Sequence, residues 1–266
     1  MKITKVIGIF AKRIIISKRF FMATILLTVL LILDLLPTFV SGISEHEGKI
    51  YFSYDVLSLF MLHGFTFLMG FSLIAAVIPG GGIYCDDNNS RFIVPILQRI
   101  NSLEYAVGVV AATFVGTFAG TFISYCLCLL FYRFFLPLSN GQNGLGTYSL
   151  VAEEKNLMFV GALITVYALR GVFFALITLV LSTFIKNKYI VFSTPFLLFY
   201  FLMIFGYGIL KMPTYLNVRG IYFGFVHGME HEIRSVAYAF FVTVIVAVLA
   251  TCVLNRRLRS IPVIQK

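Results

Sequence analysis

The stretch FFMATILLTVLLILDLLPTFV, residues 20–40, decides the fold class of this 266-residue chain. Its residues are apolar almost throughout, and Asp34 is its only ionisable side chain. A helix needs about 20 apolar residues to cross the roughly 30 Å hydrocarbon layer of a membrane. The stretch is therefore predicted to be a transmembrane helix.

The composition of the whole chain agrees with this prediction. Hydrophobic residues make up 60% of the chain and charged residues 12%, whereas a soluble domain carries about 25% charged residues. So little charge could not cover a water-facing surface, which excludes a soluble enzyme. The abundance of aliphatic and aromatic residues excludes a disordered chain. A polytopic membrane protein remains.

Five further apolar stretches are long enough to span a membrane. Because the apolar runs are continuous, each is predicted to be a helix. We expect an all-α fold in one transmembrane domain, residues 1–266, and no separate soluble domain. The six predicted spans are residues 20–40, 57–78, 105–130, 157–184, 189–210 and 236–254.

The distribution of positive charge predicts the orientation of these spans. Most of the 21 Lys and Arg residues lie in four segments: before the first span, in residues 79–103, in residues 185–188, and after the last span. Cytoplasmic loops carry an excess of Lys and Arg. We therefore expect both termini to be cytoplasmic and the chain to lie in the cell membrane.

Two segments between or before the spans have their own pattern. Residues 1–19 predict an amphipathic helix on the inner membrane surface, the alternative being a frayed basic anchor; its apolar stripe is Ile3, Val6, Ile7, Phe10 and Ile14. Residues 212–234 are too apolar for a plain loop and too broken by Gly and Pro for a span. They predict a re-entrant or interfacial outer segment.

The sequence offers no catalytic machinery. The ATP-binding pattern G-x-x-x-x-G-K-[ST] is absent. His227, Glu230 and His231 match the spacing H-x-x-E-H used by some metalloproteases, but a solvated charged turn is the simpler interpretation. We expect no metal site, no cofactor held by this chain and no nucleic-acid partner.

Three ionisable residues fall inside predicted spans: Asp34, His63 and Arg170. A charged side chain at membrane depth is costly and is expected to face the bundle interior or a water-filled cavity, so Arg170 is predicted to point inward unless it snorkels. Counted along the helices, Asp34 and His63 reach a similar depth. They are predicted to form a hydrogen-bonded pair, the alternative being that each faces an outer aqueous vestibule.

The longest cytoplasmic loop, residues 80–103, reads GGGIYCDDNNSRFIVPILQRINSL. It places the acidic pair Asp86 and Asp87 before Arg91, and then an apolar stretch with Ile93, Ile96 and Leu97. The entry to the next span follows with Ser102, Glu104, Tyr105 and Gly108. This order resembles the loop between spans two and three in the type-2 (exporter) permeases of ATP-binding cassette transporters. It departs from that pattern at Ser90 and Phe92, where glycine is common, at Arg99, which stands near the usual Pro, and at Val109, where many members carry Lys.

The resemblance implies a permease subunit of an ATP-driven exporter. In that family the loop forms a coupling helix that docks on a separate ATPase subunit, which holds the ATP and Mg²⁺. The corresponding residues here are Asp86, Asp87, Arg91, Ile93, Ile96 and Leu97; a solvated loop resting on the membrane surface is the alternative. The other expected partners are a second permease copy or paralogue and membrane lipid.

The Phe-rich spans and their few charges favour an amphipathic substrate, such as a peptide, drug or lipid-like molecule. Two other functions remain open: a non-transporting immunity or sensor protein, and an integral membrane enzyme.

Overall fold

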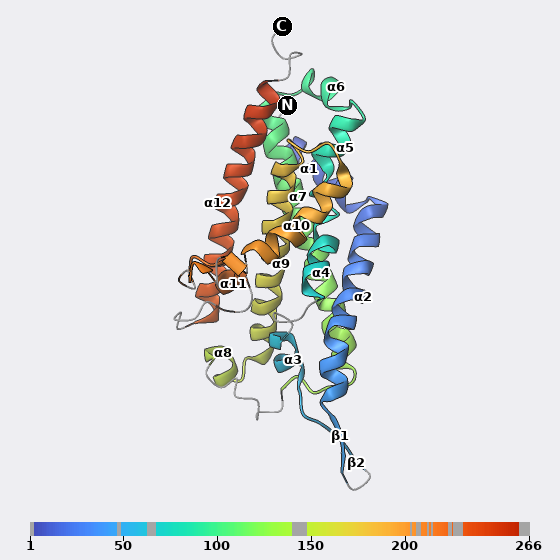
Figure 1. Cartoon of the computed structure of the whole chain (residues 1–266), viewed down its shortest axis with the longest axis vertical. Helices are drawn as coiled ribbons and strands as arrows, with labels where there is room; N and C mark the ends of the chain where they lie inside the picture. Colours follow the sequence, from blue (N-terminus) through green and yellow to red (C-terminus); the bar gives the residue numbers. More distant parts are fainter. Residues whose placement is uncertain are drawn as a thin grey trace.

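The molecule is an elongated bundle of helices, most of them running along its long axis (Figure 1). The computed structural model describes residues 3–46, 49–62, 68–139, 148–202, 204–205, 209–211, 213, 215–222, 225 and 231–260.

Four helices are long and apolar enough to cross a membrane. They are α2 (Lys18–Ser41), α7 (Ser102–Arg133), α9 (Asn156–Leu181) and α12 (Glu232–Arg259). Their positions confirm helices at four of the predicted spans. Of the four, α9 is the most buried and α12 the least, so α9 forms the centre of the bundle and α12 lies at its surface.

The structure describes the other two predicted spans only in part. Residues 57–78 contain two short helices, α3 (Val56–Leu62) and α4 (Met69–Val77), and residues 63–67 between them lie outside the described part. The predicted span 189–210 begins as α10 (Lys188–Leu202), a 15-residue helix that contains Pro195. Beyond Leu202, residues 204, 205 and 209 are π-helical, and residues 203 and 206–208 lie outside the described part. Within the described residues, four helices have spanning length, and the six spans stay a prediction.

A short antiparallel hairpin, β1 (Ile43–His46) and β2 (Lys49–Phe52), follows α2. The regular structure of the described residues is otherwise helical, as predicted, and the hairpin was not predicted. Two short helices, α8 (Ser149–Ala152) and α11 (Val218–Tyr222), lie beside the long helices of the bundle (Figure 1). The α11 helix belongs to the segment predicted to be re-entrant; several neighbouring residues lie outside the described ranges, so re-entry stays a prediction.

The N-terminal helix α1 (Ile3–Ile15) has the predicted apolar stripe, but this stripe packs against protein. Val6, Phe10 and Ile14 are buried. A Cβ atom added at Gly108 of α7 would lie 2.7 Å from Val6, and one added at Gly116 would lie 2.5 Å from Ile14. The contacts follow the same order along both helices, so α1 runs beside α7. The glycine face of α7 therefore covers Val6, Phe10 and Ile14, whereas Ile3 is exposed; the position of α1 on the inner membrane surface stays a prediction.

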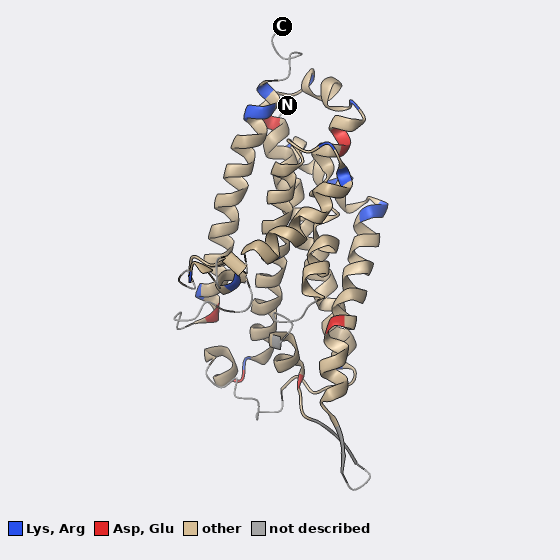
Figure 2. Ribbon diagram, in the orientation of Figure 1, with Lys and Arg blue, Asp and Glu red and all other residues tan. Residues whose placement is uncertain are grey.

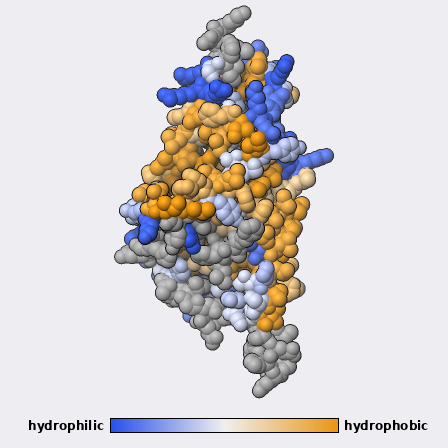
Figure 3. Space-filling view, in the orientation of Figure 1, coloured by the Kyte–Doolittle hydropathy of each residue, from blue (hydrophilic) through white to orange (hydrophobic). Residues whose placement is uncertain are grey.

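The two ends of the bundle differ in charge. The start of α1, the end of α12, and two short helices, α5 (Ile83–Asn89) and α6 (Ile93–Leu97), share one end, whereas the hairpin lies at the other (Figure 1). Lys and Arg gather at the α5–α6 end (Figure 2). Apolar side chains form a broad band along the helices below it (Figure 3). This pattern is typical of helices that cross a membrane.

Candidate functional site

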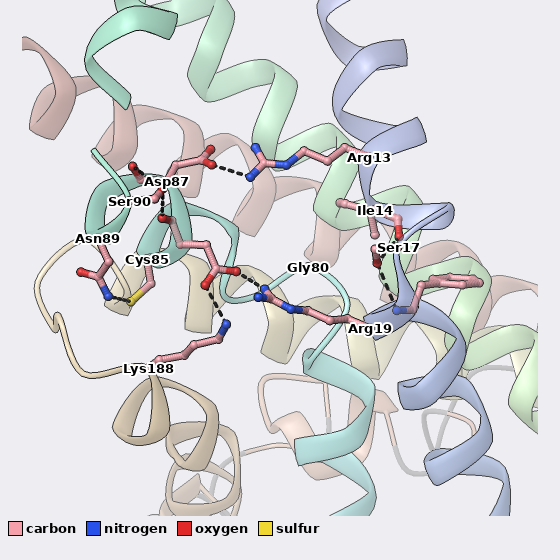
Figure 4. Close-up of polar contacts among 12 residues, drawn as sticks. Arg13, Ile14, Ser17, Arg19, Gly80, Cys85, Asp87, Asn89, Ser90 and Lys188 are labelled. Carbon is pink, nitrogen blue, oxygen red and sulfur yellow. Dashed lines mark hydrogen bonds and ion pairs between the residues drawn. The ribbon is translucent and has the colours of Figure 1, made fainter. Parts of the chain in front are cut away.

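The acidic pair of the long loop lies on α5, where it binds helices from other parts of the chain. The Asp86 carboxylate accepts a hydrogen bond from Lys188 Nζ at 2.6 Å and forms a second ion pair with Arg19. The two cations reach it from α10 and α2 (Figure 4). Asp86 therefore connects the loop to α2 and α10 through ion pairs.

Asp87 makes the corresponding contacts on the other side of α5. Its carboxylate accepts from Arg13 Nη2 at 2.6 Å and from the Tyr105 hydroxyl at 2.8 Å. The Asp87 side chain has no exposed surface, whereas that of Arg13 is half exposed. The hydrogen bond to Asp87 raises the pKa of the Arg13 guanidinium above its ordinary value. Asp87 thus connects α5 to α1 and to α7.

Glycine residues bring the loop close enough for these contacts. A Cβ atom at Gly80 would lie 2.7 Å from Thr113 of α7, and one at Gly82 would lie 2.6 Å from Phe192 of α10. The Thr113 hydroxyl donates to the Gly80 carbonyl at 3.3 Å. A residue with a side chain at either position would push the loop away from the bundle.

The short helix α6 turns its predicted docking face toward the bundle. Ile93 is buried, and Ile96 and Leu97 are partly buried against the same cluster. Phe92, by contrast, is 61% exposed. Ile93 was expected to contact a partner; here the bundle covers it, because α6 lies on the core that α1 and α7 form. Arg91, at the turn before α6, is exposed and has a φ of 58°.

A second polar site lies in the middle of the bundle. Arg170 of α9 is 1% exposed and donates to the Tyr125 hydroxyl of α7 at 2.6 Å. Its guanidinium also lies over the Tyr167 ring, 4.8 Å from the ring centroid. The prediction that Arg170 points inward is confirmed. Asp34 of α2 is also buried.

The predicted partner of Asp34, His63, lies outside the described residues, so their pairing stays a prediction. His227 and Glu230 lie outside them as well. His231 Nδ1 lies 3.1 Å from the Ser149 hydroxyl. Within the described ranges, no group of three metal-ligating side chains occurs.

Sequence reasoning missed most of the residues that complete these two sites. Arg13, Arg19, Lys188 and Tyr105 contact the acidic pair, and the Tyr125 hydroxyl accepts a hydrogen bond from Arg170. The polar partners of Asp86 and Asp87 lie up to 102 positions away along the chain. One sequence carries no signal that pairs residues so far apart.

Tyr125→Phe tests the polar site in the middle of the bundle. Removing the hydroxyl takes away the acceptor for Arg170, and hydrogen bonds to charged groups contribute about 1.5–3 kcal/mol. We expect a lower melting temperature of the detergent-purified protein. Tyr189→Phe is the matched control, because Tyr189 is 87% exposed and its change should leave the melting temperature unaltered. Equal melting temperatures for both variants would show that the Arg170–Tyr125 contact contributes nothing.

Comparison of the chain with protein-family models, curated proteins and solved structures found no match. Its function must therefore be argued from its own residues.

Proposed function

We propose that this chain is the transmembrane permease subunit of an ATP-binding cassette exporter. A separate ATPase subunit, which holds ATP and Mg²⁺, docks at the α5–α6 end, and a second permease copy or paralogue completes the path through the membrane. Both termini are cytoplasmic in this proposal, and six segments span the membrane. The chain makes or breaks no bond itself.

The observation that carries the proposal is the set of polar contacts around α5. Through two adjacent carboxylates, this seven-residue helix is bonded to α1, α2, α7 and α10. A displacement of α5 would therefore act on four helices at once. A coupling element must have this property, because it has to convert the movement of an ATPase into a movement of the spans.

The outer surface of the same loop offers a docking face. Phe92, Pro95 and Arg99 are exposed on the side of α6 away from the bundle. Phe and Arg are both enriched in protein interfaces relative to the rest of the surface. Because Ile93 faces inward, the face that meets the ATPase centres on Phe92.

The apolar character of the bundle supports an amphipathic substrate. Charged residues are few along the length of the spans, so a hydrophilic solute would find few partners there. The transport cycle relies on differential binding of such a substrate by two conformations. A peptide, a drug and a lipid-like molecule all have the required chemistry.

Phe92→Asp tests the docking face. A charge in an apolar contact has no compensating partner, so we expect the variant to lose the ATPase subunit that the wild type retains in detergent. Its own size-exclusion profile should not change, because the side chain is exposed. Phe134→Asp is the control, since Phe134 is 86% exposed and lies at the far end of α7. Retention of the ATPase by both variants would remove α6 from the interface.

A further inference from the structure

A polar pocket opens on the opposite side of α5 from the ion pairs. Its volume is about 480 Å³, and it lies between α5, the end of α9 and the end of α12. Three cationic side chains line it: Arg91, Lys186 and Arg257. Of the described residues that line this pocket, none carries a carboxylate.

No side-chain hydrogen bond of these three cations occurs among the described residues. Among the described residues, none of the three forms an ion pair. Burial raises the pKa of Tyr84, and the charge of Arg257 opposes this shift. Arg257 and Tyr84 both line the pocket.

The carbonyl groups at the end of α9 accept hydrogen bonds from donors other than these three cationic side chains. The Ser182 hydroxyl donates to the Leu179 carbonyl at 2.6 Å. The N–H groups of Phe184 and Ile185 both donate to the Leu181 carbonyl at 3.0 Å. The Asn89 amide donates to the Lys186 carbonyl at 3.2 Å. These acceptors already have partners, so the cations remain available for an anion.

The position of the pocket indicates where the anion comes from. The pocket lies where two helices of spanning length, α9 and α12, end. Phe184 lines it and is 63% exposed, and Tyr189 nearby is even more exposed. Exposed aromatic rings at the ends of spans lie at the level of the lipid headgroups. The hydrophilic α5–α6 end of the molecule borders the apolar band (Figure 3).

We propose that this pocket binds the phosphate-bearing headgroup of an anionic phospholipid. Arg91, Lys186 and Arg257 neutralise the phosphate, and basic pockets between spans are known to hold such headgroups. The site does not depend on the proposed transport function. It would fix the positions of α5, α9 and α12 relative to the membrane surface.

Native mass spectrometry of the detergent-purified full chain tests this proposal. Phosphatidylglycerol, phosphatidylcholine and inorganic phosphate are added separately at equal concentration. We expect the wild type to retain phosphatidylglycerol, and Lys186→Gln/Arg257→Gln to bind it about thirtyfold more weakly. The control Lys5→Gln/Lys12→Gln loses the same charge at exposed positions of α1 outside the pocket and should bind it as the wild type does. Equal melting temperatures without lipid would show that all three proteins are folded.

Several results would overturn the proposal. Equal binding by the wild type and the pocket variant would remove the site, and equal losses in both double variants would show an effect of net charge alone. Displacement of the lipid by inorganic phosphate at the same concentration would assign the pocket to a free anion. Equal retention of phosphatidylcholine would contradict selection of an anionic lipid. If the pocket variant kept its lipid but lost a bound ATPase, the pocket would be a protein interface.

Discussion

We expect Asp87→Ala to give the largest loss of stability of any single substitution at the α5–α6 end. The substitution leaves the Tyr105 hydroxyl buried without its acceptor and releases Arg13 from α5. Breaking a buried ion pair costs about 3–5 kcal/mol. Because Arg13 is half exposed and regains water, we expect a value near the lower limit, about 3 kcal/mol. The melting temperature in detergent measures it.

Two further variants separate this effect from a general loss of charge. Asp87→Asn keeps the shape and one acceptor, so its melting temperature should lie between those of the wild type and Asp87→Ala. Glu153→Gln removes a carboxylate from an ion pair with Lys155 in which both side chains are about half exposed. Exposed pairs contribute little to stability, so this control should melt as the wild type does. If Asp87→Ala also melted at that temperature, α5 would not be held to α1 through Asp87.

The second large effect is expected where α1 meets α7. In Gly116→Ala, the new Cβ atom would lie 2.5 Å from Ile14 Cγ2. This atom belongs to a β-branched side chain with few alternative rotamers, so α1 must shift. Overpacking of this kind costs about 1–3 kcal/mol. We expect a lower melting temperature, together with faster proteolysis of α1.

The chain offers a matched control and a rescue for this substitution. Gly161 of α9 has no heavy atom within 4 Å of an added Cβ atom, so Gly161→Ala should be neutral or slightly stabilising. Ile14→Ala removes the clashing atom, and the double variant Gly116→Ala/Ile14→Ala should lose less stability than the sum of the two single variants. Additive losses would show that Gly116 and Ile14 do not determine the contact.

The spans were predictable to the extent that length and composition determine them. Residues 20–40 have no alternative to a buried or lipid-facing helix, and α2 covers them. The segment 189–210 has the same composition, and its described residues are helical over α10 and again at residues 204, 205 and 209. The apolar stripe of α1 could pack on lipid or on the glycine face of α7, and the sequence pattern does not distinguish these two surfaces.

The candidate site was predictable in part. The sequence singled out Asp86 and Asp87 as the polar residues of the loop, but it could not distinguish a partner protein from Arg13, Arg19 and Lys188 of the same chain. The helical spacing of the apolar residues likewise identifies the apolar face of α6, but it does not show whether the bundle or a partner covers that face. Arg170 was predicted to point inward because a charged side chain at membrane depth is costly when it faces lipid, and it is buried in the bundle.

Purification of the tagged full chain from the membranes of the cells that express it tests the central claim most directly. We predict that a protein with an ATP-binding P-loop co-purifies with it and that the complex hydrolyses ATP. We also predict that Phe92→Asp abolishes both, whereas Phe134→Asp preserves them. A chain that purifies without such a protein, in a preparation that hydrolyses no ATP, would contradict the assignment as a permease subunit.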